Sequence, residues 1–113
     1  MNSRDRGVRG ELAVRDFLRE RGYAEARRGQ QYSGLGDSPD VVGVPGLHIE
    51  VKNTRRLALY DAVDQSVRDC GAGSVPIVFH IFDRRRTGAR GRELVILSAT
   101  DFFDLWAEAK ERT

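Results

Sequence analysis

Three charged residues in the middle of the chain have types and spacing that could do chemistry together. Asp40 precedes a short run of valines, and Glu50 and Lys52 stand two positions apart in the next apolar stretch. Residues two apart in a strand point to the same face, so Glu50 and Lys52 share one. If the two stretches pair as a hairpin around Pro45-Gly46, Asp40 lies beside Glu50. Two carboxylates and an amine so placed can bind Mg²⁺ and activate a water molecule, whereas the plainer interpretation of Glu50 and Lys52 is a solvated ion pair.

The composition favours a special role for Lys52. The chain has 19 basic residues, and all of them are arginines except Lys52 and Lys110. Arginine keeps its proton at working pH, whereas lysine is a compact charge whose pKa shifts readily. Codon bias explains an excess of arginine but not the exception at position 52, although two lysines must fall somewhere.

Glu11 is a third candidate acid. The spacing predicts a helix from about Asp5 to Arg21, ended by Gly22, with Glu11 at the edge of the core-facing stripe. A carboxylate near a core needs a cation. Two partners remain open, either Arg15 one turn on or a metal held together with Asp40.

The remaining pattern predicts an α/β fold with a mixed sheet covered by helices. We expect strands at 23–32, 41–42, 47–53, 75–82 and 93–97, and helices at 5–21, at 57–70 and after Ser98 or Thr100, in the order α-β-β-β-α-β-β-α. The second helix has one apolar face, formed by Leu59, Tyr60, Ala62, Val63, Val67 and Cys70. The last helix is amphipathic and carries Leu105; its Phe102, Phe103 and Trp106 fit core positions, with a dimer contact as the alternative for Trp106.

Length and composition predict one intracellular domain over residues 1–113. The chain has 113 residues, 32% charged, with neither a membrane-spanning apolar run nor a secretory signal at its start. The single Cys70 excludes an internal disulfide and a cysteine zinc site, and we expect it to be buried. His48 shares the face of Glu50 at the far end of the strand, and His80 is expected to be a structural histidine.

The distribution of arginine predicts an anionic polymer as partner. The net charge is only +2, but arginines gather in a few places that could lie along one side of the molecule. Their planar side chains suit phosphate groups. The candidate DNA-binding arginines are Arg6, Arg9, Arg55, Arg56, Arg84, Arg85 and Arg86.

Taken together, Gly7 with Glu11, Pro39-Asp40 and Glu50-Val51-Lys52, in this order of elements, resemble the PD-(D/E)xK nuclease superfamily. Within it the chain is most similar to archaeal-type Holliday junction resolvases, including versions carried by phages, in which case its location would be the host cytoplasm. The resemblance covers about residues 6–97. It implies a restriction-endonuclease-like fold with a mixed five-stranded sheet.

The resemblance also implies roles for single residues. Asp40, Glu50 and the main-chain carbonyl of Val51 would bind Mg²⁺, for which Mn²⁺ may substitute, with Glu11 completing the acidic cluster. Lys52 would orient or activate the attacking water. Two further DNA contacts are implied, at Ser38 and Gln65. Where the archaeal enzymes usually have arginine after the helix glutamate, this chain has Leu12, so that a first-helix phosphate contact would fall to Arg9 or Arg15.

The function implied is a Mg²⁺-dependent, structure-selective DNA endonuclease that resolves four-way junctions in recombination and repair as a homodimer. A two-fold dimer matches the two symmetric strands of a junction, and the last helix and strand 75–82 are candidate dimer surfaces. Two alternatives are another small nicking or restriction-type nuclease of the superfamily and a non-catalytic DNA-binding module on the same fold.

Overall fold

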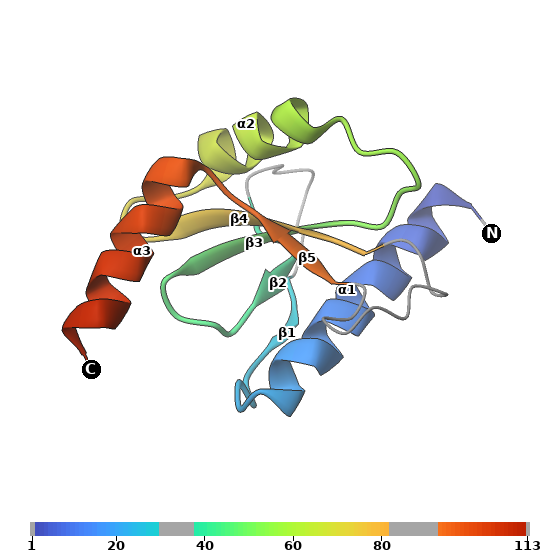
Figure 1. The fold of residues 1–113 in the computed structure, drawn as a ribbon. Helices are drawn as coiled ribbons and strands as arrows, with labels where there is room; N and C mark the ends of the chain where they lie inside the picture. Colours follow the sequence, from blue (N-terminus) through green and yellow to red (C-terminus); the bar gives the residue numbers. More distant parts are fainter. Residues whose placement is uncertain (1, 30–37, 82–92, 113) are drawn as a thin grey trace.

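The computed structural model describes residues 2–29, 38–81 and 93–112. Within these ranges the chain is an α/β protein whose elements follow the predicted order (Figure 1). They are α1 (Ser3–Glu20), β1 (Arg27–Arg28), β2 (Val41–Val42), β3 (Leu47–Lys52), α2 (Leu59–Asp69), β4 (Val75–His80), β5 (Leu94–Ile96) and α3 (Ala99–Glu111).

The strands form one mixed sheet in the order β1-β2-β3-β4-β5. The central pair, β3 and β4, is parallel, and the other pairs are antiparallel. A parallel pair needs a crossover connection, which α2 supplies between the two strands. In Figure 1, α1 and α2 lie on opposite sides of the sheet. Both faces of the central strands are therefore covered, and Ile77, Val78 and Phe79 are buried in succession, as the apolar run predicted.

The core lies between α1 and the sheet. Val14 and Leu18 from α1 pack with Val41, Ile49 and other buried side chains of the strands. Phe17 adds an edge contact to Phe79, with ring centroids 5.8 Å apart. These residues recur at helical spacing in α1 and at alternate positions in β3, which is why each element turns one face inward.

Helix α1 starts earlier than predicted because Asn2 caps it. The Asn2 side chain accepts a hydrogen bond from the backbone N–H of Asp5 at 2.9 Å. Gly10 brings the helix close to β3: a Cβ at this position would lie only 3.0 Å from Cβ of Asn53 and 3.2 Å from Cγ1 of Val51. The side chain of Asn53 also donates to the main-chain oxygen of Arg6 at 2.9 Å. Helix α1 is thus fixed against the end of β3.

The predicted strand at 23–32 is wrong over its first part. Tyr23 to Ala26 form a turn, closed by the Ala26 N–H on the oxygen of Tyr23 at 3.0 Å, and only Arg27–Arg28 form a strand. β1 is short because a tight return from α1 leaves only these residues in register with β2. Residues 30–32, Phe82 and the predicted basic loop 84–92 lie outside the described residues.

Part of the predicted core is instead exposed. In α2, Leu59, Tyr60 and Val67 face solvent, and the buried positions are Ala62 and Ser66. Helix α3 starts at Ser98, whose hydroxyl caps the N–H of Asp101, as predicted, but it has no buried residue. The prediction of core positions in α3 is therefore wrong for Phe102, Phe103 and Trp106, and Leu105 is exposed as well.

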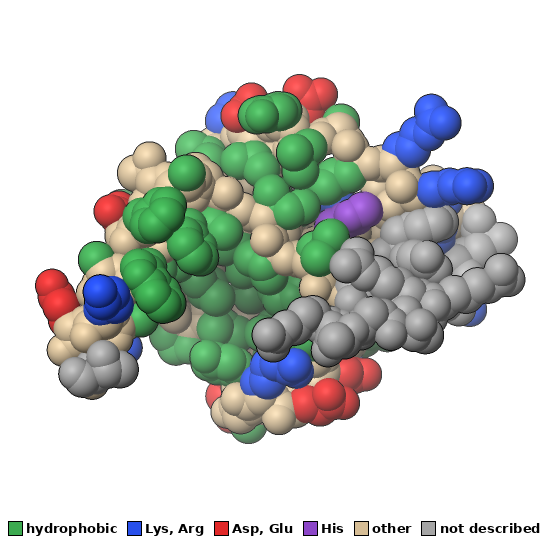
Figure 2. Space-filling view, in the orientation of Figure 1, with side chains coloured by type: hydrophobic (Ala, Val, Ile, Leu, Met, Phe, Trp, Pro, Cys, Tyr) green, Lys and Arg blue, Asp and Glu red, His purple; other side chains and the backbone are tan. Residues whose placement is uncertain are grey.

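The exposed apolar side chains form a continuous area in one view of the molecule (Figure 2). We call it the apolar face; its largest members are Val95 of β5 and Phe102, Phe103, Leu105 and Trp106 of α3. Cys70 is half-buried rather than buried, with Sγ 3.3 Å from the oxygen of Ser74. Among the described helices, none combines the length and apolar character needed to cross a membrane.

Candidate active site

The β2–β3 hairpin brings Asp40 beside Glu50. Val41 pairs with Ile49, and the N–H of Asp40 donates to the oxygen of Ile49 at 2.9 Å, so the next positions in the antiparallel register are Asp40 and Glu50. Asp40 Oδ2 accepts a hydrogen bond from the N–H of Val51 at 2.8 Å. A further hydrogen bond joins the carboxyl groups of Asp40 and Glu50. The hairpin predicted from the sequence therefore places the two acids in direct contact.

Glu50 is held in an environment that disfavours its charge. Its side chain is almost fully buried, and burial, followed by the charge and the hydrogen bond of Asp40, raises its pKa to about 8. Lys52 acts in the opposite direction. At neutral pH Glu50 therefore keeps its proton. A divalent cation can take the place of that proton.

His48 contacts the same pair. Its Nε2 lies 2.8 Å from Oε1 of Glu50, and only 5% of its surface is exposed. Burial lowers the pKa of His48, against the charges of Asp69 and Asp40, so the contact is a hydrogen bond of a neutral ring. We predicted from the sequence that His48 shares a face with Glu50. No role was expected for it, because it lies at the far end of the same strand. The alternation of side chains was the signal that could have found this contact.

The backbone of β3 also presents an oxygen to the site. Lys52 accepts a hydrogen bond from the N–H of Ile81 through its main-chain oxygen, so this oxygen faces β4. Backbone groups of neighbouring residues in a strand point to opposite neighbours. The carbonyl of Val51 is thus on the side of Asp40, where its own N–H bonds the Asp40 side chain.

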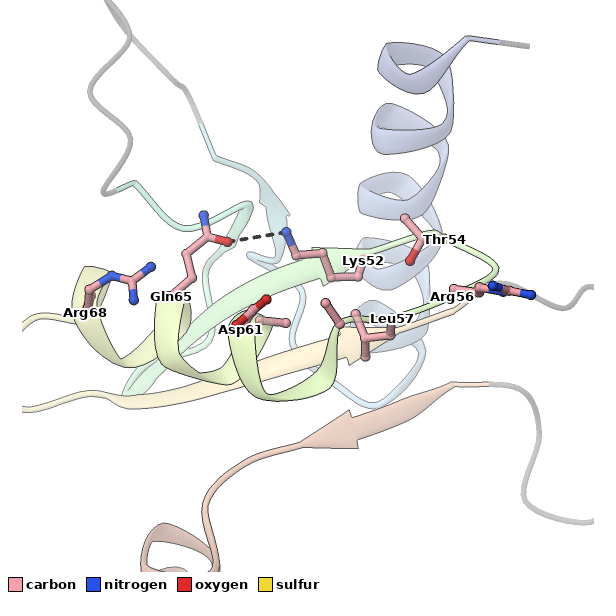
Figure 3. Close-up of a pocket in the computed structure, with 9 residues that line it drawn as sticks. Lys52, Thr54, Arg56, Leu57, Asp61, Gln65 and Arg68 are labelled. Atoms are coloured by element: carbon pink, nitrogen blue, oxygen red, sulfur yellow. Dashed lines mark hydrogen bonds between the residues drawn. The ribbon is translucent and has the colours of Figure 1, made fainter.

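Lys52 lies on the face of β3 that α2 covers. Its Nζ is 3.5 Å from Oε1 of Gln65 in α2, a long hydrogen bond that Figure 3 shows. Its charge lowers the pKa of Glu50, which shows that ammonium and carboxyl act on one another. Glu50 and Lys52 share a face as predicted, but Glu50 is buried and not half of a solvated pair.

Glu11 has a cationic partner that the sequence did not identify. Its Oε1 accepts a hydrogen bond from Nε of Arg28 in β1 at 2.8 Å. Arg15, the intrahelical alternative, instead pairs with Asp16 at 2.8 Å, so that alternative is wrong. Burial and the charge of Asp40 raise the pKa of Glu11, while Arg28 lowers it. Glu11 therefore lies within reach of the charge on Asp40, held by an arginine at the sheet edge.

These groups fit a divalent metal of the Mg²⁺ type. Mg²⁺ is commonly held by one or two carboxylates, with water and substrate oxygens filling the other positions. Asp40 and Glu50 supply two contacting carboxyls, and the Val51 carbonyl a third oxygen. Across the described ranges, no group of three or more histidine, cysteine and acidic side chains is arranged to hold a metal. Glu11 is thus not grouped with the pair, and a metal here would use two carboxylates.

The predicted DNA contacts are divided between two areas. Arg9 is exposed on α1 and lines a hollow with Arg4. Arg6 is half-buried, with a side-chain hydrogen bond to Ser3. Others lie around the ends of β2 and β3 and along α2; they are Ser38, Arg55, Arg56 and Gln65. Arg84, Arg85 and Arg86 lie outside the described residues.

A pocket of about 310 Å³ opens beside Lys52. It is bounded by the end of β3, by the loop that follows and by α2 from its first to its last turn (Figure 3). Its lining residues are Lys52, Thr54, Arg56, Leu57, Ala58, Asp61, Ala62, Gln65 and Arg68. Sequence reasoning missed Asp61 and Arg68, because each looks like an ordinary surface charge of an amphipathic helix. His80 is structural as expected, its Nε2 lying 2.7 Å from the oxygen of Thr54.

Comparison with known proteins adds no relative: no family model, curated protein or solved structure matches this chain. The function proposed below therefore rests on the residues of the candidate site and on their geometry.

Proposed function

We propose that this protein is a Mg²⁺-dependent DNA endonuclease with a restriction-endonuclease-like fold, most suited to branched substrates such as four-way junctions. The observation that carries the proposal is the contact of Asp40 with Glu50 at the end of β2 and β3, with Lys52 on the same face. This is the arrangement that the resemblance to PD-(D/E)xK nucleases requires. The mixed sheet and the order of the helices and strands are consistent with this proposal.

Asp40, Glu50 and the Val51 carbonyl would hold the metal. Bound there, Mg²⁺, or Mn²⁺ in its place, lowers the pKa of water and offsets charge on the phosphate. The hydrogen bond from the N–H of Val51 fixes one carboxylate, and the His48 ring fixes the other. Both acids are therefore oriented before substrate arrives, which limits the rearrangement needed in the transition state.

Lys52 supplies the cation next to the attacking water. Its Nζ is positioned by Gln65, and among the described residues no carboxylate forms a close ion pair with it. An ammonium there stabilises the extra negative charge of the phosphorane-like transition state and can exchange a proton with water. Glu11 is paired with Arg28 of β1, which compensates its charge at the sheet edge.

A homodimer would present two such sites to a junction. The apolar face offers a surface for the second copy, since four aromatic or leucine side chains of α3 are exposed there. Apolar patches of this kind on small proteins commonly mark protein contacts. Strand β4 is not a candidate surface, because it lies inside the sheet between β3 and β5. The expectation that strand 75–82 forms a dimer surface is therefore wrong for the described residues 75–81.

The test is incubation with a synthetic four-way junction, a linear duplex and single strands of the same sequences, with Mg²⁺ or with EDTA. We expect paired, symmetric nicks in the junction alone and only with Mg²⁺. Equal cutting of all duplexes would favour a nicking or restriction-type nuclease. Binding without cleavage under every metal condition would reject the enzyme in favour of a DNA-binding module.

A further inference from the structure

The pocket beside Lys52 has lining groups that metal binding does not use. We propose that this pocket binds one nucleotide of the DNA that has left the base stack, next to the phosphate to be cut. The inference deepens the proposed function and rests on it for the identity of the polymer. It does not depend on the metal, because neither Asp40 nor Glu50 lines the pocket.

The size of the pocket suits one nucleotide. Its volume of about 310 Å³ is at the lower end of the range typical of small-molecule sites. A space of this volume is too small for a base pair of a duplex with its two backbones. A single base with its sugar can. The pocket is open at the surface, so a nucleotide can enter while its neighbours stay in the polymer.

The charge of the lining favours an anion with a polar edge. Three cations, Lys52, Arg56 and Arg68, face one carboxylate, Asp61. The side chains of Arg56, Asp61 and Arg68 have no hydrogen-bond or ion-pair partner in the described part of the chain. In Figure 3 the two arginines stand at opposite ends of the pocket, with Asp61 between them. A DNA strand that lies along the pocket would therefore meet a guanidinium at each end.

The middle of the pocket suits a base. Leu57, Ala58 and Ala62 give it a carbon surface against which a flat ring can pack. Asp61 can accept hydrogen bonds only, so it favours bases with an exocyclic amino group (adenine, cytosine and guanine) over thymine, whose one donor is its ring N3–H. Gln65 uses its side-chain oxygen for Lys52, which leaves its NH₂ group as a donor.

The location gives the pocket a role in substrate choice. Lys52 belongs both to the catalytic face of β3 and to the pocket wall, so a nucleotide bound here is adjacent to the scissile phosphate. Extruding a base from an intact duplex costs a few kcal/mol, and less where pairing is already disturbed. Branch points would therefore be favoured over plain duplex without any reading of sequence.

The test is an NMR titration of the metal-free protein with dAMP, dCMP, dGMP, dTMP and inorganic phosphate. We expect amide shifts confined to residues 52–68 and binding of dCMP about tenfold tighter than that of dTMP, the size of one good base contact. Asp61→Asn should reduce this difference to about twofold. Asp64→Asn, an exposed acid on the same helix outside the pocket lining, should leave it unchanged.

The outcomes separate the pocket from the nuclease. Absence of shifts at 52–68, or inorganic phosphate binding as well as every nucleotide, overturns the inference. If the wild-type protein then still cuts junctions with Mg²⁺, the proposed function survives without it. Selective nucleotide binding by a protein that cuts no DNA would support the pocket and reject the nuclease.

Discussion

The imidazole of His48 and the carboxyl of Glu50 form a buried hydrogen bond, with Nε2 and Oε1 2.8 Å apart. Both side chains lie on the face of β3 that also carries Lys52. The bond restrains Glu50 from one side while Asp40 restrains it from the other. Burial of Glu50 disfavours its charged form, so the stability of the protein depends on pH.

Stability should fall as pH rises between 6.5 and 8. The folded protein keeps the proton of Glu50 up to about pH 8, whereas the unfolded chain has already lost it, so unfolding releases a proton in this window. The free energy of unfolding then decreases by up to roughly 1.4 kcal/mol per pH unit. His48, whose pKa is lowered from 6.5, is neutral in the folded protein, so loss of its proton in the unfolded chain offsets part of this slope close to pH 6.5. Urea titrations without metal at several pH values measure the slope.

Glu50→Gln is the matched control, because it keeps the shape of the side chain and removes the ionisable group. Its stability should be nearly constant from pH 6.5 to 8. A wild-type slope that survives in Glu50→Gln would show that another group is responsible.

Metal binding should release about one proton per site at pH 7. Mg²⁺ or Mn²⁺ would replace the proton that Glu50 keeps at this pH, since ligands bind metals in their deprotonated form. Calorimetry in two buffers of different ionisation enthalpy measures the number of protons. Asp40→Asn should weaken Mn²⁺ binding by more than about tenfold, whereas Asp64→Asn should bind as the wild type does. Unchanged affinity in Asp40→Asn would remove this residue from the metal site.

Lys52→Ala should lower the cleavage rate by about 10²-fold or more while DNA affinity changes little. Its ammonium acts on the transition state, and a single contact adds little to the binding of a large polymer. Lys52→Arg keeps the charge but cannot give up a proton, so its rate separates a charge role from proton transfer. Lys110→Ala is the control on α3. Loss of DNA binding in a folded Lys52→Ala protein would argue against catalysis by Lys52.

Phe103→Glu and Trp106→Glu should convert a dimer to a monomer. Both side chains are more than half exposed, at 62% and 54%, and burying them against a second copy would supply much of the association energy. Light scattering after gel filtration measures the mass, and Glu108→Gln on the same helix is the control. A wild-type protein that is monomeric at high micromolar concentration would rule out this interface.

The sequence was most informative where local rules decide the structure. Alternation along β3 and the Pro-Gly turn were enough to predict that Asp40 meets Glu50, and the register confirms the pairing. The Ser98 cap of α3 was visible for the same reason, since a cap depends on three or four neighbouring residues.

Contacts between distant segments could not be predicted in this way. The partner of Glu11 is Arg28, 17 residues away, and it depends on how the turn after α1 sets the register of β1. The exposure of the apolar face could not be predicted for the same reason. Helical spacing finds an apolar stripe in α2 and α3, but it does not tell whether the sheet or a second copy covers Leu59 or Trp106.

The β3–α2–β4 crossover has a consequence for how the molecule acquires its native state. Lys52, the pocket beside it and Gln65 all come from one continuous stretch, residues 47–80. Contacts between residues that are close in sequence form faster than contacts between distant ones. The β2–β3 hairpin pairs Val41 with Ile49, whereas the crossover has to bring Val75 beside Leu47, so we expect the carboxyl pair at the hairpin to form before β4 joins β3.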